Sequence, residues 1–279
     1  MKWAVEAETA IKKVPFFVRK RVRARVEKEA MQAGKKVVTL ADVQATQARY
    51  LTSMSSEIKG YQVDACFGPG GCPNRANPGD RLMQKIEALL IAEDLLGFLK
   101  QHVQGDLKFH HEFRITFADC PNGCSQPQIK DIGILGACLP KISASPCTLC
   151  EACVDACAEG AIRLDSREEM PAIDFEKCLK CGQCVQVCPS GTIAEGEKGY
   201  RVQLGGKLGR HPKLAWELPG IFTEDEVLGI VKYCLDFYKK NSQQGERFAE
   251  IFQHGDFEQL SAGVQNYLNR PLRSSRKER

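Results

Sequence analysis

Fourteen cysteines, gathered in short-spaced groups, constrain this chain more than any other sequence feature. A disulfide framework belongs to small secreted folds, whereas cysteines two or three residues apart in a reducing compartment are typical of metal ligands. With 279 residues, 43% of them apolar, the chain can bury a hydrophobic core without covalent cross-links. The cysteines therefore predict metal centres.

Two cysteine runs of identical spacing lie within residues 141–195. The segment CTLCEACVDACAEGAIRL is echoed about thirty residues later by CLKCGQCVQVCPSGTIAEG. Each run has the spacing C-x2-C-x2-C-x3-C, and such tight loops wrap thiolates around one [4Fe–4S] cube. Structural zinc is the alternative, but zinc prefers two separated pairs of ligands. The candidate ligands are Cys147, Cys150, Cys153, Cys157, Cys178, Cys181, Cys184 and Cys188.

Four more cysteines are divided between two loops. Cys66 and Cys72 enclose a glycine-rich C-x5-C loop, and Cys120 and Cys124 form C-x3-C about fifty residues later. The glycines and Pro121 let the backbone bend tightly around a bulky inorganic centre. Four thiolates again suffice for one cube, so the sequence predicts three clusters and a role in electron transfer. The two remaining cysteines, Cys138 and Cys234, lie in apolar surroundings and are expected to be buried.

Apolar periodicity predicts an α+β fold around these cysteines. Alternation predicts a strand over 61–65 that leads into Cys66, and Phe109, Phe113, Ile115 and Phe117 predict one face of a strand that leads into Cys120. The other expected elements are a helix over 80–101, a strand over 131–137, a strand from Tyr200 that ends in a glycine turn, a helix opened by a capping box at Thr223–Glu226, and a shorter helix after Gly255.

Residues 1–57 are expected to be helical and carry a concentrated positive charge. Pro15 is expected in the first turn of a basic helix that ends near Gly34, and Thr39 is expected to cap the next helix. Residues 11–36 hold ten Lys or Arg, although the net charge of the chain is only +4. The run is either a solvated helix face or a dock for an acidic electron-transfer partner. Nucleic-acid binding is disfavoured because the run has no interleaved aromatic residues.

The N-terminus has no apolar stretch like that of a signal peptide, and no apolar run approaches the length of a membrane span. A reducing, cytoplasmic location is therefore expected. So many oxygen-sensitive clusters also suggest an anaerobic setting.

The cysteine-dense block resembles a bacterial two-cluster ferredoxin over about fifty residues. The resemblance implies that the fourth cysteine of each run binds the other run's cluster. Pro189 follows Cys188 as in that pattern, whereas Ala158 replaces the usual proline after Cys157. Cluster I would then be held by Cys147, Cys150, Cys153 and Cys188, and cluster II by Cys178, Cys181, Cys184 and Cys157.

The C-x5-C and C-x3-C pair resembles the cluster motif of sirohaem-dependent sulfite and nitrite reductases. ADCPNGCSQPQIKDIGILGA and YRVQLGGKLGRHPKLA are similar to segments of that family, so the resemblance covers roughly residues 60–270. It implies a sirohaem whose iron is bridged to the third cluster by Cys124, with sulfite or nitrite as substrate. The cations in the matching stretches, each a candidate for anion binding or an ordinary surface charge, are Arg114, Lys130, Lys207 and Arg210.

The resemblance also implies partners. Sulfite reductases combine two related modules around each sirohaem, and this chain has room for one, so a second subunit or a second copy is expected beside an electron-donor protein. The N-terminal segment resembles the small C-terminal domain of a light-independent protochlorophyllide reductase subunit. His110 and His111, before Cys120, are candidates for a haem ligand, a proton donor or simple pocket lining.

These observations predict a modular chain and leave three functions open. The first is a sulfite- or nitrite-reductase-like oxidoreductase subunit, the second is a three-cluster electron-transfer subunit without sirohaem, and the third is a tetrapyrrole-handling or maturation protein. The expected domains are a helical domain over 1–57, a sirohaem and [4Fe–4S] domain over 58–140 and 196–270, an inserted ferredoxin over 141–195, and a basic tail over 271–279.

Overall fold

The computed structural model describes residues 1–14, 16–165 and 169–268. The expectations for Pro15 and for the basic tail lie outside these residues. The chain divides into two compact units, one formed by 1–58 with 105–109 and the other by 59–104 with the residues from 110 onward. No helix in the described ranges is both long and apolar enough to cross a membrane.

The first unit is helical, as the sequence predicts. Its small core contains Ala7, Val26 and Val38. Thr39 precedes the third helix as expected, and its amide and hydroxyl both donate to the Asp42 carboxylate, at 2.9 and 2.7 Å. The elements are β1 (Lys2–Trp3), α1 (Val5–Lys12), α2 (Phe16–Gln32), β2 (Val37–Val38) and α3 (Leu40–Ser56), with β1 and β2 paired in parallel.

The second unit is built on a mixed five-stranded sheet with the strand order β3-β4-β5-β8-β9. The strands β3, β4 and β5 run parallel, and β8 is antiparallel to both of its neighbours. Strands precede Cys66 and Cys120, as the sequence predicts. The strands are β3 (Tyr61–Ala65), β4 (Phe113–Ala118), β5 (Ile132–Ile142), β8 (Ile193–Leu204) and β9 (Trp216–Glu217).

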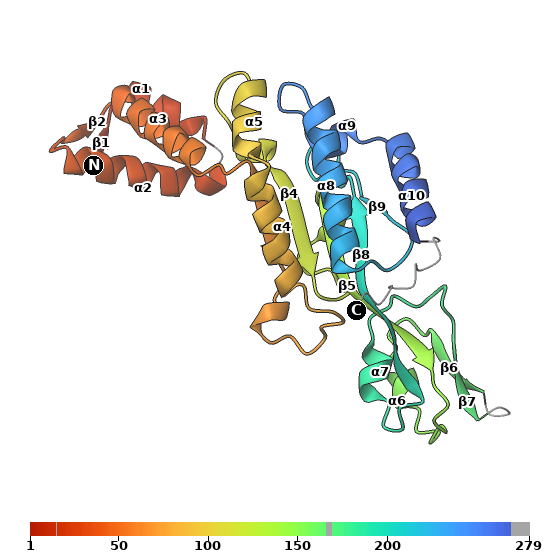
Figure 1. Cartoon of the computed structure of the whole chain (residues 1–279). Helices are drawn as coiled ribbons and strands as arrows, with labels where there is room; N and C mark the ends of the chain where they lie inside the picture. The colour runs from red at the N-terminus through yellow and green to blue at the C-terminus, as the bar shows by residue number, and fades with distance from the viewer. Residues whose placement is uncertain (15, 166–168, 269–279) are drawn as a thin grey trace, which may run out of the picture. The chain divides into compact units, whose positions relative to one another are not determined.

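Helices cover this sheet and complete its core. Figure 1 shows α4 and α8 side by side over one face of the sheet, and Lys85 of α4 donates to Glu224 of α8 at 2.7 Å. The capping box at Thr223 opens α8 as predicted. The helices are α4 (Asp80–Ala92), α5 (Leu95–His102), α8 (Glu224–Asn241), α9 (Phe248–Ile251) and α10 (His254–Leu268), and short 3-10 turns occur at Gly68–Gly70, Phe109–His111 and Pro127–Ile129.

Several predicted elements differ in extent from the observed ones, and β5 and β8 run beyond the strands expected over 131–137 and from Tyr200. The single helix expected over 80–101 breaks at Asp94, which has a φ of 43° and accepts a hydrogen bond from the amide of Gly97 at 3.1 Å. An aspartate in this left-handed conformation starts a new helix as its N-cap, so α4 and α5 are separate. The strand expected from Phe109 begins only at Phe113, because the partner strand β3 itself starts opposite Phe113, at Tyr61.

The cysteine-dense block is carried between two long strands. β5 and β8 pair over most of their length. The chain between these two strands forms α6 (Ala152–Asp155), β6 (Ile162–Asp165), β7 (Met170–Ile173) and α7 (Gln183–Val187). The block has its own small core, in which Cys153 and Cys184 pack with Ile162 and Ile193. The backbone amide of Cys138 on β5 donates to the carbonyl of Lys180 at 2.8 Å, which ties the block to the sheet.

Candidate iron–sulfur site

Parallel pairing of β3 and β4 brings the two halves of the third cysteine group together. Ala65 pairs with Phe117, so Cys66 and Cys120 follow two neighbouring strands at the same edge of the sheet. The amide of Cys66 donates to the carbonyl of Phe117 at 3.0 Å, which extends the pairing up to the first thiol. All four predicted thiols line one small cavity of about 50 Å³, namely Cys66, Cys72, Cys120 and Cys124.

Backbone amides are directed at the Cys66 sulfur. The C-x5-C loop turns through the 3-10 segment and then through Gly71, whose φ of 101° favours glycine. This turn places the amide of Gly68 3.4 Å from the Sγ of Cys66, and the amide of Asp119 approaches the same Sγ at 3.3 Å. N–H groups around a sulfur stabilise its negative charge, as a thiolate ligand requires.

The C-x3-C loop is a tight turn closed by the amide of Gly123 on the carbonyl of Cys120, at 3.3 Å. Pro121 occupies the position of the turn where a fixed φ is favoured, and Gly123 has a φ of 61°. Burial raises the pKa of the Cys120 thiol, and a hydrogen bond from the amide of Asn122 partly offsets this effect. Cys124 is exposed, whereas the other three thiols of the group are half-buried.

Asp119 fixes the loop that carries Cys72. Its buried carboxylate accepts hydrogen bonds from Arg75 Nε at 2.6 Å and from the amide of Gly79 at 3.1 Å. Its carbonyl accepts from the amides of Ala76 and Asn77, at 2.8 and 3.1 Å. One residue thus joins the end of β4 to the whole segment between Cys72 and α4.

Substitution of Gly68 by alanine is expected to eliminate selectively the third cluster that the sequence predicts. A Cβ at Gly68 would lie 1.9 Å from the Asp119 carboxylate, and this carboxylate is held by Arg75 and cannot move aside freely. Iron per chain should fall from about twelve to about eight, since a [4Fe–4S] centre holds four irons. The measurement is the iron content of anaerobically reconstituted protein.

The matched control is Gly70→Ala in the same loop. Among the described residues, no atom lies within 4 Å of the position that a Cβ would take at Gly70. This variant should keep about twelve irons, the content of three intact cubes. Equal iron contents in the two variants would contradict the claim that the third cluster depends on the close packing of Gly68 against the Asp119 carboxylate.

The other eight thiols are predicted to form two groups that each draw a fourth member from the other run, and Cys157 of the first run lines one cavity with Cys178, Cys181 and Cys184 of the second. Burial raises the pKa of Cys153, and the other thiols that add to this effect are Cys188 and Cys147. Burial raises the pKa of Cys184 to about 12, with further contributions from Cys181, Cys178 and Cys157. Amides again approach the sulfurs, at 3.3 Å for Ala161 on Cys157 and for Ile193 on Cys188.

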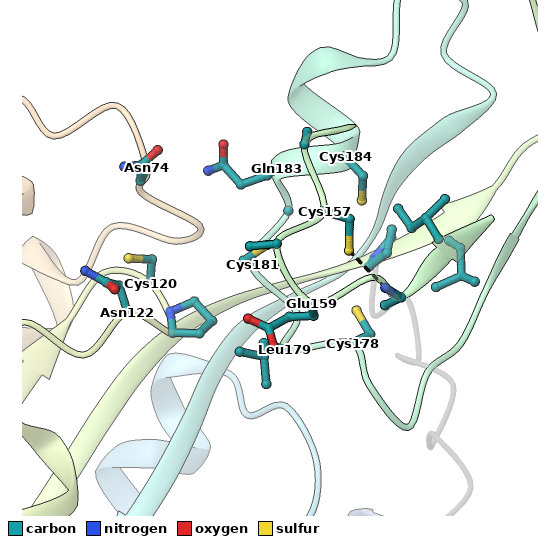
Figure 2. A pocket seen from close by; sticks show the side chains of 18 residues that line it. Asn74, Cys120, Asn122, Cys157, Glu159, Cys178, Leu179, Cys181, Gln183 and Cys184 are labelled. Carbon is teal, nitrogen blue, oxygen red and sulfur yellow. Dashed lines mark hydrogen bonds between the residues drawn. The ribbon is translucent and has the colours of Figure 1, made fainter. Parts of the chain in front are cut away.

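One of these groups lies next to the third. A cavity of about 550 Å³ is lined by Cys157, Cys178, Cys181 and Cys184, and also by Cys120, Asn122 and Asn74. Figure 2 shows the four thiols on one side of this cavity and the two asparagines with Cys120 on the other. The two groups are therefore direct neighbours in the fold.

The four predicted cations are spread over different elements. Lys130 pairs with Asp64 at 2.8 Å, and Lys207 pairs with Glu250 at 3.1 Å. Arg114 lies on β4, where its amide donates to the Asp131 carboxylate at 2.9 Å, and Arg210 is exposed. Each lysine thus has its own carboxylate neighbour, which holds its ammonium group in place.

Sequence reasoning missed three polar residues of this region. Asp119 and Arg75 form the bonds described above, and Asn122 donates from Nδ2 to the Sγ of Cys124 at 3.0 Å. A polar residue enclosed by two cysteines in C-P-N-G-C is the signal by which Asn122 could have been found. Cys138 and Cys234 are buried, as predicted.

The donor set fits iron–sulfur chemistry. Within the described ranges, no three His, Cys, Asp or Glu side chains are placed to hold a single metal ion. A cube does not require that, since each of its four irons takes a different thiolate. Four thiols around one cavity, with two N–H groups directed at the Cys66 sulfur, match the cluster that the sequence predicts.

An α+β fold with thiol groups of this kind defines an iron–sulfur redox protein. Residues 61–272 match the family described as the nitrite and sulphite reductase 4Fe-4S domain. The match spans well over half of the chain, and the chain belongs to this family of oxidoreductases. The family predicted from the cysteine motifs is thereby confirmed, and the α+β fold predicted from apolar periodicity is the fold observed.

Curated relatives agree with this assignment. The chain is 33% identical over 203 residues to the coenzyme F420-dependent sulfite reductase of Methanocaldococcus jannaschii, a match that covers 72% of this chain and 31% of that protein. It is 28% identical over 209 residues to one subunit of the anaerobic sulfite reductase of Salmonella typhimurium, covering 73% of this chain and 56% of that protein. The matched region is thus less than two thirds of the length of either relative.

The fold and the N-terminal segment have separate matches. The crystal structure of dissimilatory sulfite reductase I superposes with a TM-score of 0.51 at 16% identity, covering 81% of this chain and 58% of that chain, which supports the fold alone. Residues 3–47 match the proto-chlorophyllide reductase 57 kD subunit family. Over 37 residues, 13% of this chain and 7% of the relative, the identity to one subunit of the light-independent protochlorophyllide reductase of Chloroflexus aurantiacus is 62%.

Proposed function

We propose that this chain is the sirohaem-binding, electron-carrying subunit of a sulfite reductase. The observation that carries the proposal is the exposure of Cys124 beside three half-buried thiols that line the same cavity. Three half-buried ligands and one exposed ligand suit a cluster that shares one sulfur with a second cofactor. The names of the curated relatives favour sulfite over nitrite as substrate.

Electrons are proposed to pass through two ferredoxin clusters to the third cluster. Cluster I would be held by Cys147, Cys150, Cys153 and Cys188, and cluster II by Cys157, Cys178, Cys181 and Cys184. The exposure of Cys150 supports cluster I as the point where a donor protein delivers electrons. The cavity lined by both the cluster II thiols and Cys120 supports cluster II as the last step before the third cluster.

Sirohaem, when bound, supplies the iron at which the substrate anion is reduced. The chain itself would present the Cys124 sulfur and positive charge. Lys130 and Lys207 each lie beside a carboxylate that holds the ammonium group in place. With Arg114 and Arg210, they are proposed to neutralise the anion and the macrocycle carboxylates, and the lysines can also deliver protons.

Partners are part of the proposal. One relative is named as a single subunit of its enzyme, and we infer that a second subunit or a second copy of this chain completes the sirohaem pocket. A reducing, cytoplasmic environment suits so many free thiols.

The test is the visible spectrum of anaerobically purified protein, recorded with and without sulfite or nitrite. Bound sirohaem should give macrocycle bands that shift when sulfite is added, and with a reduced viologen dye as the electron source sulfite should be reduced faster than nitrite. A broad iron–sulfur spectrum without macrocycle bands, from protein supplied with sirohaem and its partner, would overturn the proposal and favour a three-cluster electron-transfer subunit.

A further inference from the structure

We propose that Asn122 sets the reduction potential of the third cluster by donating a hydrogen bond to the Cys124 sulfur. This inference rests on the proposed function, because it needs a cluster at that site. It assigns a positioning role to a residue that neither the motif nor the family match singles out.

The geometry is that of a donor held in place by its turn. Nδ2 of Asn122 lies 3.0 Å from the Sγ of Cys124. Asn122 thus donates directly to the exposed sulfur of the group. Pro121 and the left-handed Gly123 on either side fix the turn, so the side-chain amide is directed at the sulfur by the backbone.

Asn122 also lies between two thiol groups. It lines the small cavity of the third group and the larger cavity formed by the cluster II thiols. Figure 2 shows it beside Cys120, on the side of the larger cavity that faces Cys181. A change in its side chain would thus act where electrons are proposed to arrive.

The physical effect has a definite sign. A reduced cluster carries one more negative charge than an oxidised one, and an N–H group directed at a ligand sulfur stabilises that charge. Hydrogen bonds to the sulfurs are one of the factors that set cluster potentials. Removal of the Asn122 amide should therefore make the third cluster harder to reduce.

The experiment is a redox titration of the fully loaded chain, followed by electron paramagnetic resonance. In Asn122→Leu, the ratio of reduced to oxidised third cluster at a given potential should fall about tenfold, which for a one-electron couple is about 59 mV. The two ferredoxin clusters should titrate as in the parent protein and serve as an internal reference.

Asn74→Leu is the matched control. Asn74 is also an exposed asparagine that lines both cavities, yet no hydrogen bond in the described part of the chain joins it to a cysteine sulfur. Its substitution should leave all three potentials unchanged. Equal shifts in the two variants would overturn the proposal, since they would indicate a general change of polarity.

A second substitution keeps the proposal testable if Asn122→Leu does not retain the third cluster. Asn122→Asp keeps the size of the side chain but cannot donate when ionised, so it should shift the potential in the same direction. An unchanged potential in either variant, or loss of the third cluster from both, would overturn the tuning role. If the parent protein itself holds only about eight irons, the content of two cubes, it is the proposed function that fails.

Discussion

Replacement of Cys124 by serine is expected to abolish sulfite reduction while both ferredoxin clusters remain. Cys124 is the exposed thiol of its group, and it is the sulfur proposed to join the third cluster to sirohaem. Loss of an outer-sphere partner of a metal ligand already costs roughly ten- to a hundredfold in activity, so loss of the shared sulfur should cost at least about a hundredfold. The measurement is sulfite-dependent oxidation of a reduced viologen dye by the loaded protein with its partner.

Cys234→Ala provides the control for removal of a thiol. Cys234 is fully buried in α8 and packs in the main core, among residues such as Leu235 and Tyr238. Its loss should lower stability modestly and leave sulfite reduction per loaded chain unchanged. Full activity in the Cys124 variant would show that electrons reach the sirohaem without passing through this sulfur.

Replacement of Cys181 by alanine is expected to interrupt the electron path between the ferredoxin block and the third cluster. Cys181 lines the cavity that also contains Cys120, and it belongs to the thiol group assigned to cluster II. Without that cluster, a donor protein should still reduce cluster I, but the third cluster should remain oxidised. Rapid mixing with the reduced donor, followed at low temperature by electron paramagnetic resonance, measures both clusters.

Cys150→Ala is the companion variant, because it removes a proposed ligand of cluster I, at the other end of the proposed path from the third cluster. Dithionite, a small reductant, should still reduce cluster II and then the third cluster in this variant. In Cys181→Ala, dithionite should reduce the third cluster only by reacting with it directly, because cluster II is absent. Reduction of the third cluster by the donor at the parental rate in Cys181→Ala would contradict the assigned order.

Features of the site that depend on short-range spacing could be predicted from sequence. The cysteine runs act within a few residues, and the turn at Cys120–Gly123 follows from a proline and a glycine at suitable positions. The strands before Cys66 and Cys120 follow from alternation, and the capping box of α8 follows from Thr223 and Glu226. Each of these signals is complete within one segment.

Features that depend on distant segments could not be predicted. Asp119 and Arg75 are separated by 44 positions, and Lys207 meets Glu250 across 43. The break at Asp94 depends on competition between a helical pattern and a local side-chain bond to the Gly97 amide, which periodicity alone does not decide. The length of β5 depends on its pairing with β8, which lies beyond the inserted block.

Native mass spectrometry of the anaerobically purified chain tests the central claim most directly, because it counts all bound groups in one measurement. The account predicts a mass increase over the bare polypeptide equal to three [4Fe–4S] clusters and one sirohaem. It further predicts that Gly68→Ala loses one cluster and the sirohaem together, whereas Gly70→Ala loses neither. A parent protein that carries two clusters and no macrocycle, after reconstitution with iron, sulfide and sirohaem, would contradict it.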